Sequence, residues 1–265
     1  MKKSLLRNFI VCAVFGFVLI GCKKEAVSPQ VEEISENTLE RISKLGFSNK
    51  NVVTHEDGYL VEGDIVITEQ DLNRVPQSQF LRIGGEEQYR TYNLVKSLPR
   101  TIKVSISSKF SSSYVAALDE ALARYNALGL NLTFQRVSSG ANISIVKITG
   151  GNYLASAGFP TSTGNPYSQV KVNTRAIGNQ PLGTVASILA HEIGHCIGFR
   201  HTDYMSRQYS CGGSAVNEGA STVGAEHIPG TPTGPDAGSW MLACIGSGQN
   251  RPFTSNDRTA LNYLY

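Results

Sequence analysis

The chain has 265 residues, with 24 lysines and arginines against 21 aspartates and glutamates, and a formal net charge of +3. A hydrophobic content of 41% excludes a disordered chain, and 17% charged residues with 26 glycines exclude a coiled coil. Lys2, Lys3 and Arg7 stand at the very start, so the remainder is balanced at 21 basic and 21 acidic residues. A neutral chain without a basic stripe is not expected to bind nucleic acid.

The first residues have the pattern of an export signal. After the basic start, residues 9–20 are all apolar or glycine, a run of signal-core length that is too short to span a bilayer comfortably. It ends at Leu19-Ile20-Gly21-Cys22, which resembles the lipobox of bacterial lipoproteins, where the cysteine is lipidated. We therefore predict a lipoprotein signal peptide at 1–21 and a membrane anchor on Cys22; the alternative is an ordinary secretory signal. Lys23 and Lys24 favour the outer membrane or cell surface, by analogy with lipoprotein sorting.

The sequence after the signal predicts a tether followed by a small N-terminal region, which could be a propeptide. Residues 22–35 are polar and predict a tether, and residues 36–98 form the N-terminal region. Hydrophobic spacing there predicts a helix at 36–46, short strands at 52–53 and 58–67, and a short capped helix at 68–72. Residues 75–99 are polar and predict irregular structure.

From residue 99 to 265 the pattern changes to that of a larger domain. Alternation of Ile102, Val104 and Ile106 predicts a strand with one buried face. Further strands are predicted at 130–137, 143–148 and 170–172, and helices at 111–128, 184–196 and 256–265. This order predicts an α+β fold with a mixed twisted sheet, a central helix, and a loop-rich C-terminal subdomain that ends in a helix.

The end of the helix at 184–196 carries the chemistry. His191 and His195 are four residues apart, so both imidazoles leave one helix face and can bind one Zn²⁺. Gly198 can end the helix in the left-handed conformation and let His201 return as the third ligand. Three protein ligands leave a position for water, as a catalytic zinc requires. Glu192 is then the candidate general base.

The residues HEIGHCIGFRH at 191–201 resemble the metzincin signature, and the HEIGH lettering is similar to the dual-action HEIGH metallopeptidase family. The resemblance implies a metzincin-like fold and a zinc endopeptidase. It also implies a methionine turn beneath the zinc, for which Met241 is the candidate. It further implies an edge strand that binds substrate antiparallel through backbone hydrogen bonds, which we expect at 155–159. Asp203 is expected either to hydrogen-bond a ligand imidazole or only to cap a turn.

A possible inhibitory residue lies in the N-terminal region. Val61-Glu62-Gly63-Asp64-Ile65 is similar to the inhibitory segment of astacin-type propeptides, in which an aspartate takes the open zinc position. Asp64 would then displace the catalytic water. The alternative, which the shortness of the motif favours, is that Gly63-Asp64 is only a hairpin element. Cleavage near Arg90, Lys96 or Arg100 would release the catalytic part from its lipid.

Three cysteines remain after the signal peptide and Cys22. An exported compartment permits disulfides, and three thiols allow one bridge. Cys211 and Cys244 flank a glycine-rich loop and are the favoured pair, whereas Cys196 lies in a helix pattern and is expected to be a buried thiol. His227 is expected to be a solvated loop residue.

These residues together predict a monomeric, lipid-anchored zinc endopeptidase that acts on proteins or peptides. One alternative is a binding or adhesion lipoprotein on the same scaffold without proteolysis, and another is a zinc hydrolase of a non-peptide substrate. A third concerns the ligand set, in which Glu218 would replace His201 as the third ligand.

Overall fold

The computed structural model describes residues 34–45, 47–73, 88–213, 217, 225–232 and 234–265. The predicted signal peptide, Cys22 and most of the tether therefore lie outside the described residues. Among the helices that are described, none combines the length and the apolar character needed to cross a bilayer.

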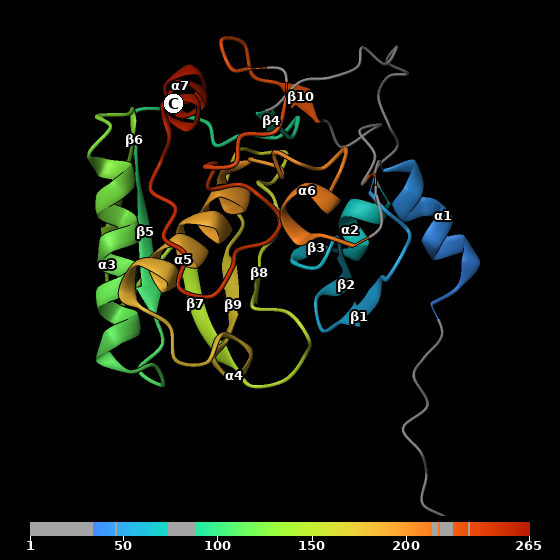
Figure 1. Cartoon of the computed structure of the whole chain (residues 1–265), viewed down its shortest axis with the longest axis horizontal. Coiled ribbons are helices and arrows are strands. Elements are labelled where there is room, and N and C mark those ends of the chain that lie inside the picture. Colours follow the sequence, from blue (N-terminus) through green and yellow to red (C-terminus); the bar gives the residue numbers. More distant parts are fainter. Residues whose placement is uncertain (1–33, 46, 74–87, 214–216, 218–224, 233) are drawn as a thin grey trace, which may run out of the picture. The chain divides into compact units, whose positions relative to one another are not determined.

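A five-stranded sheet forms the centre of the larger domain (Figure 1). Four strands are parallel, and the fifth, β8, runs antiparallel at the edge beside β9. The sheet is therefore mixed, as predicted, and β8 is one of its two edge strands. In spatial order the strands are β6 (Leu132–Arg136), β5 (Arg100–Ile106), β7 (Ile143–Ile148), β9 (Gln169–Asn173) and β8 (Ala155–Ser156).

Two long helices, α3 (Ser112–Asn126) and α5 (Leu182–Ile197), pack against each other and against the sheet. Helix α3 buries one stripe, including Leu118 and Tyr125, because its apolar residues recur at helical spacing. Helix α5 is buried on nearly every side from Thr184 onward, so it lies inside the domain and not on its surface. The remaining elements of this domain are α4 (Thr174–Ile177), α6 (Gln208–Cys211), β10 (Glu226–His227), α7 (Ser255–Leu264) and the short strand β4 (Tyr89–Arg90).

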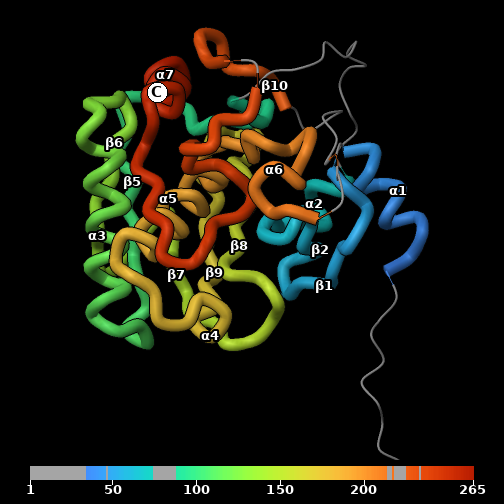
Figure 2. Tube along the Cα trace, in the orientation of Figure 1, coloured from blue at the N-terminus to red at the C-terminus, as the bar shows by residue number. Residues whose placement is uncertain are grey.

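The α+β prediction is confirmed, including the closing helix. Helix α7 begins at a capping box in which the Thr254 hydroxyl accepts from the Asp257 amide and the Asp257 carboxylate accepts from the Thr254 amide. The tube view shows this helix in red above the sheet, after the long irregular C-terminal stretch (Figure 2).

The N-terminal region folds into a small unit with its own core. It contains α1 (Glu36–Lys44), β1 (Val53–His55), β2 (Gly58–Val61), β3 (Ile65–Ile67) and α2 (Glu69–Leu72). The strand expected at 58–67 is split in two by a turn at residues 62–64, and the three strands form an antiparallel sheet. Its core is separate from the main one and consists of Ile42, Leu45, Phe47, Val61, Ile65, Ile67 and Leu72.

The stretch expected to be irregular before residue 99 is part of the larger domain where it is described. Strand β4 (Tyr89–Arg90) pairs with β10, and Val95 packs in the main core. Gln88 is fully buried and donates to the Asp257 carboxylate at 2.7 Å. Apart from β4, residues 88–99 form no helix or strand, as predicted, but several of them are buried in the larger domain, Gln88 through hydrogen bonds and not through an apolar run.

Candidate metal centre

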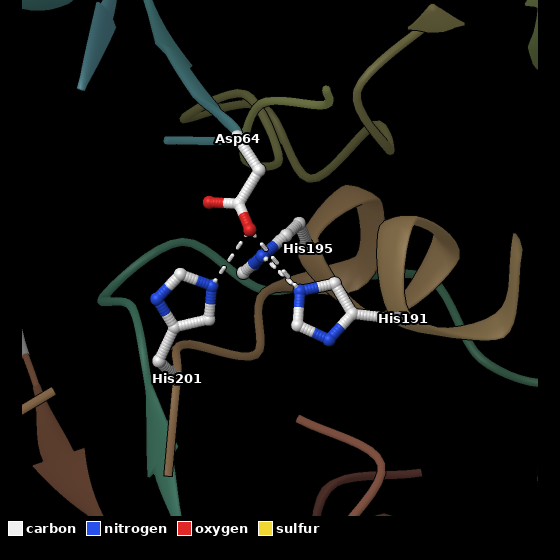
Figure 3. Close-up of side chains that lie close together, drawn as sticks. All are labelled: Asp64, His191, His195 and His201. Carbon is white, nitrogen blue, oxygen red and sulfur yellow. Dashed lines mark hydrogen bonds and ion pairs between the residues drawn. The ribbon is translucent and has the colours of Figure 1, made fainter. Parts of the chain in front are cut away.

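Three histidines meet at the end of α5 (Figure 3). His191 and His195 project from the last turns of the helix, and their Nε2 atoms are 3.0 Å apart. His201 arrives from the following loop, with its ring centroid 5.3 Å from that of His191 and 4.9 Å from that of His195. The three side chains form the arrangement that the sequence spacing predicts.

Gly198 makes this return possible. It follows the last helical residue with a φ of 114°, a left-handed conformation that side chains disfavour. A Cβ at this position would also lie 2.9 Å from the carbonyl oxygen of Asn93. Only glycine fits, and the chain can then turn back through Phe199 toward His201.

The two helical imidazoles are oriented by backbone carbonyls. Nδ1 of His191 lies 2.9 Å from the carbonyl oxygen of Trp240, and Nδ1 of His195 lies 2.8 Å from that of Phe199. A ring whose Nδ1–H donates to a carbonyl presents Nε2 as its lone-pair donor. Burial and the neighbouring histidines lower the pKa of His195, which keeps the ring neutral as a metal requires. Backbone carbonyls leave no trace in the sequence pattern, so these partners could not be predicted.

The site also includes a carboxylate from the N-terminal region. Asp64 lies in the turn between β2 and β3, and its Oδ2 is 3.1 Å from Nε2 of His201 and 3.6 Å from Nε2 of His191. Burial alone would raise the pKa of Asp64, but the three histidines hold it well below its ordinary value. Asp64 is thus a hairpin residue, but the favoured prediction that it is only a hairpin element is wrong, because its carboxylate contacts the histidines; its inhibitory role stays a prediction.

These four side chains fit a zinc ion. Their candidate ligand atoms all lie within 4.8 Å of one another, and all four residues are buried. Tetrahedral ligands about 2.0–2.1 Å from zinc are separated by roughly 3.3 Å, close to the distances observed here. Three imidazole nitrogens and one carboxylate oxygen form a donor set typical of zinc.

Glu192 lies beside the histidines and is buried, with 3% of its surface exposed. Its Oε2 has no hydrogen-bond partner among the described residues. Burial raises the pKa of Glu192 well above its ordinary value, and the charge of Asp64 adds to that effect. The side chain lines a cavity of about 230 Å³ next to the histidines, together with His191, Asp64 and Trp240.

Met241 lies beneath the helix, as the resemblance implies. It is fully buried, and its Sδ would lie 2.6 Å from a Cβ added to Gly194. Its carbonyl accepts from the Thr202 amide at 2.9 Å, which ties the turn to the chain just after His201.

Asp203 supports the same turn. Its Oδ1 accepts from the Ala243 amide at 2.9 Å, and its Oδ2 accepts from the Ser210 hydroxyl at 2.5 Å. These contacts correspond to the second predicted role, the cap of a turn, since the hydrogen bonds described for Asp203 go to no imidazole.

The remaining predicted residues lie outside the centre. Cys211 and Cys244 form a disulfide, and Cys196 is a buried thiol. His227 lies in β10, where its Nε2 is 3.0 Å from the Thr231 hydroxyl, so it is neither a free loop residue nor a ligand of this site. Glu218, the alternative ligand, lies outside the described residues.

The family model described as dual-action HEIGH metallo-peptidase matches residues 59–265. No curated protein sequence matches the chain. Among solved structures, the chain is similar to myroilysin at 14% identity, with 65% of this chain and 95% of that chain covered and a TM-score of 0.43. It is also similar to high choriolytic enzyme 1, a hatching enzyme zinc-protease from the medaka fish Oryzias latipes, at 19% identity, with 62% and 88% covered and a TM-score of 0.40.

Proposed function

The chain belongs to the dual-action HEIGH metallo-peptidase family and is a zinc metallopeptidase, and we propose that it is an endopeptidase with Glu192 as its general base. His191, His195 and His201 hold the zinc ion in this proposal. The observation that carries it is Oε2 of Glu192, which is buried and has no hydrogen-bond partner among the described residues, on a side chain that lines the cavity beside the histidines.

The division of work follows from the positions of the side chains. Zinc, when bound, supplies a Lewis acid that polarises a peptide carbonyl and stabilises the negative charge that develops on it. Glu192 takes a proton from the attacking water at Oε2 and delivers it to the leaving amine. The raised pKa of Glu192 suits this exchange, because a group whose pKa is shifted toward the working pH can both accept the proton and return it.

The β8 edge of the sheet supports a peptide as the substrate. The segment 64–66 already lies along this edge as an added strand: the Val66 amide donates to the Ala157 carbonyl at 2.7 Å, and the Ala157 amide donates to the Asp64 carbonyl at 2.9 Å. An edge that binds one extended segment through backbone hydrogen bonds suits other extended peptides. This argues against the non-peptide alternative.

We also propose that Asp64 keeps the enzyme latent. Its carboxylate lies where a fourth ligand would, and the strand at 64–66 runs parallel to Ala157, opposite to the antiparallel direction expected for substrate. A segment bound in the reverse direction presents no correctly oriented carbonyl to Glu192, so it blocks the cleft without being cut.

The activating cut is then expected before Gln88. The N-terminal unit has its own core and can leave as a unit, whereas Val95 packs in the main core and Tyr89 is buried against Tyr204. Arg90 pairs with Glu226, and Arg100 begins strand β5 inside the five-stranded sheet. After a cut at Arg90, Lys96 or Arg100, the N-terminal fragment would still include residue 88 and the residues after it, which are bound to the larger domain. We therefore propose that the cut lies between Asn73 and Gln88.

Export and lipidation at Cys22 complete the proposal, since the lipobox resemblance and the disulfide both suit an oxidising compartment outside the cytoplasm. Partition into the detergent phase of Triton X-114, lost in Cys22→Ala, tests the anchor. Retention of the wild-type chain in the aqueous phase would contradict it.

The experiment for the catalytic proposal compares zinc content and casein cleavage of the Asp64→Ala chain with and without Glu192→Gln. We expect one zinc ion per chain in both and cleavage at least about a hundredfold slower in the double variant, the usual contribution of a general base. Equal rates would contradict the role of Glu192. Zinc binding with no cleavage by either chain would favour the binding lipoprotein.

A further inference from the structure

A buried ion pair joins the N-terminal unit to the chain just before the third histidine. Nη2 of Arg200 donates to both carboxylate oxygens of Glu62, at 3.0 Å and 2.9 Å. Neither side chain has any exposed surface. Removal of one partner of such a pair strongly destabilises the folded protein, because the remaining charge is left without those hydrogen bonds in an interior that solvates it poorly.

Arg200 is enclosed by residues of both the N-terminal unit and the larger domain, and we call this enclosure the socket. The guanidinium carbon lies 4.6 Å from the ring centroid of Phe47, in the N-terminal unit, and 5.7 Å from that of Tyr204, in the larger domain. When the N-terminal unit leaves, Phe47 and Glu62 leave with it. Arg200 and Tyr204 stay with the metal ligands and face the vacated space.

The position of the ion pair relative to the metal centre points to a role for Arg200 in substrate binding. Glu62 is two residues before Asp64, whose carboxylate contacts His201, and Arg200 directly precedes His201. The socket is therefore next to the cleft and within reach of a peptide that crosses the histidines. We infer that Arg200 is a specificity residue that binds an acidic side chain of the peptide substrate, in the place that Glu62 occupies in the intact chain.

The direction of the bound segment fixes the position of that acidic residue. Ile65 pairs with Ala157 in a parallel bridge, so residues before Asp64 extend away from the edge strand on the far side of the metal centre. A substrate that runs antiparallel to Ala157 fills the same groove in the opposite order. The place of Glu62 then belongs to the second residue after the scissile bond.

This inference rests on the proposed function, and one experiment separates the two. The full chain with Glu62→Gln and Asp64→Asn loses both charged contacts of the segment, so its cleft exchanges with added peptide. Tryptic peptides of casein are incubated with it, and mass spectrometry maps each cut. We expect aspartate or glutamate at the second residue after the cut about tenfold more often than chance, as a charged hydrogen bond warrants.

Two variants assign this preference. Adding Arg200→Gln is expected to abolish it. Adding Lys171→Gln is the matched control, because buried Lys171 pairs with Glu56 and Asp57 of the same unit but seven or more residues from Asp64. Cuts without an acidic preference at that position, or a preference that survives Arg200→Gln, would overturn the inference.

A binding measurement keeps the test independent of hydrolysis and of folding defects. Glu192→Gln is added to the full chain that carries Glu62→Gln and Asp64→Asn. Fluorescence anisotropy then compares the affinities of two seven-residue peptides, which are apolar except for one glutamate or one glutamine. We expect the glutamate peptide to bind at least about tenfold more tightly, and Arg200→Lys to reduce that ratio. A preference in binding without any cleavage would contradict the proposed function alone, and equal binding would contradict the inference alone.

Discussion

Oδ2 of Asp64 lies 3.1 Å from Nε2 of His201, although 137 positions separate the two residues in the sequence. The contact brings a carboxylate of the N-terminal unit to the three nitrogens that converge at the end of α5. Because a carboxylate is a good fourth ligand for zinc, the same residues that suit the metal also suit a blocked state of the enzyme.

The packing between α5 and the methionine turn gives a first prediction. In Gly194→Ala, the new Cβ would lie 2.6 Å from Sδ of fully buried Met241 and 3.1 Å from Nε1 of Trp240. Overpacking of about 1–3 kcal/mol is expected to exceed the gain of about 1 kcal/mol in helix propensity. Thermal unfolding should therefore show a lower Tm and titration a weaker zinc affinity. Gly150→Ala is the control, since no atom lies within 4 Å of its Cβ; an equal loss there would contradict the packing account.

The disulfide gives a second prediction. Cys211 and Cys244 are 33 positions apart in the sequence, and the loop that their bridge closes contains the methionine turn. In the chain-entropy account, the loss of such a bridge lowers the free energy of unfolding by about 3–4 kcal/mol. Denaturant unfolding of the double variant Cys211→Ser/Cys244→Ser measures this directly. Cys196→Ser changes a buried thiol outside the bridge and separates the loss of the crosslink from the loss of a cysteine.

The pH dependence of the N-terminal unit gives a third prediction. Burial lowers the pKa of His55, Lys171 lowers it further, and Asp57 and Glu56 oppose this. A lowered pKa in the folded state means that the stabilising contribution is present above the unfolded value of about 6.5 and is lost as the pH falls below it. The protection factors of the β1–β2 hairpin amides, which correct for the slower intrinsic exchange at lower pH, should therefore fall on mild acidification. In His55→Gln this fall should be smaller; an unchanged fall would contradict the assignment.

Much of the fold was predictable because local patterns and tertiary packing agree. The alternation at Ile102, Val104 and Ile106 corresponds to β5, and the histidine spacing with Gly198 corresponds to the end of α5 and its return. Each of these signals depends on neighbours in sequence, where periodicity and helix caps are informative.

The rest depends on contacts between distant segments. The turn that divides β2 from β3 brings Asp64 to the histidines, but a short motif alone could not distinguish that from an ordinary hairpin. Gln88 is buried through hydrogen bonds to Asp257, and polar composition gave no sign of it. Glu62, the partner of Arg200, also lies 138 positions away in the sequence, and no local pattern connects the two residues.

The most direct test of the account is the time course of casein cleavage by the zinc-loaded full chain and by its Asp64→Ala variant, with the integrity of residues 34–87 followed by mass spectrometry. We expect the wild-type chain to show a lag that ends when the N-terminal unit is cut, and the variant to cleave casein at once while that unit is intact. Asp119→Asn, which breaks an exposed ion pair with Arg136, should keep the lag. A wild-type chain that cleaves without delay while intact, or a variant with an unchanged lag, would contradict the claim that Asp64 blocks the zinc centre.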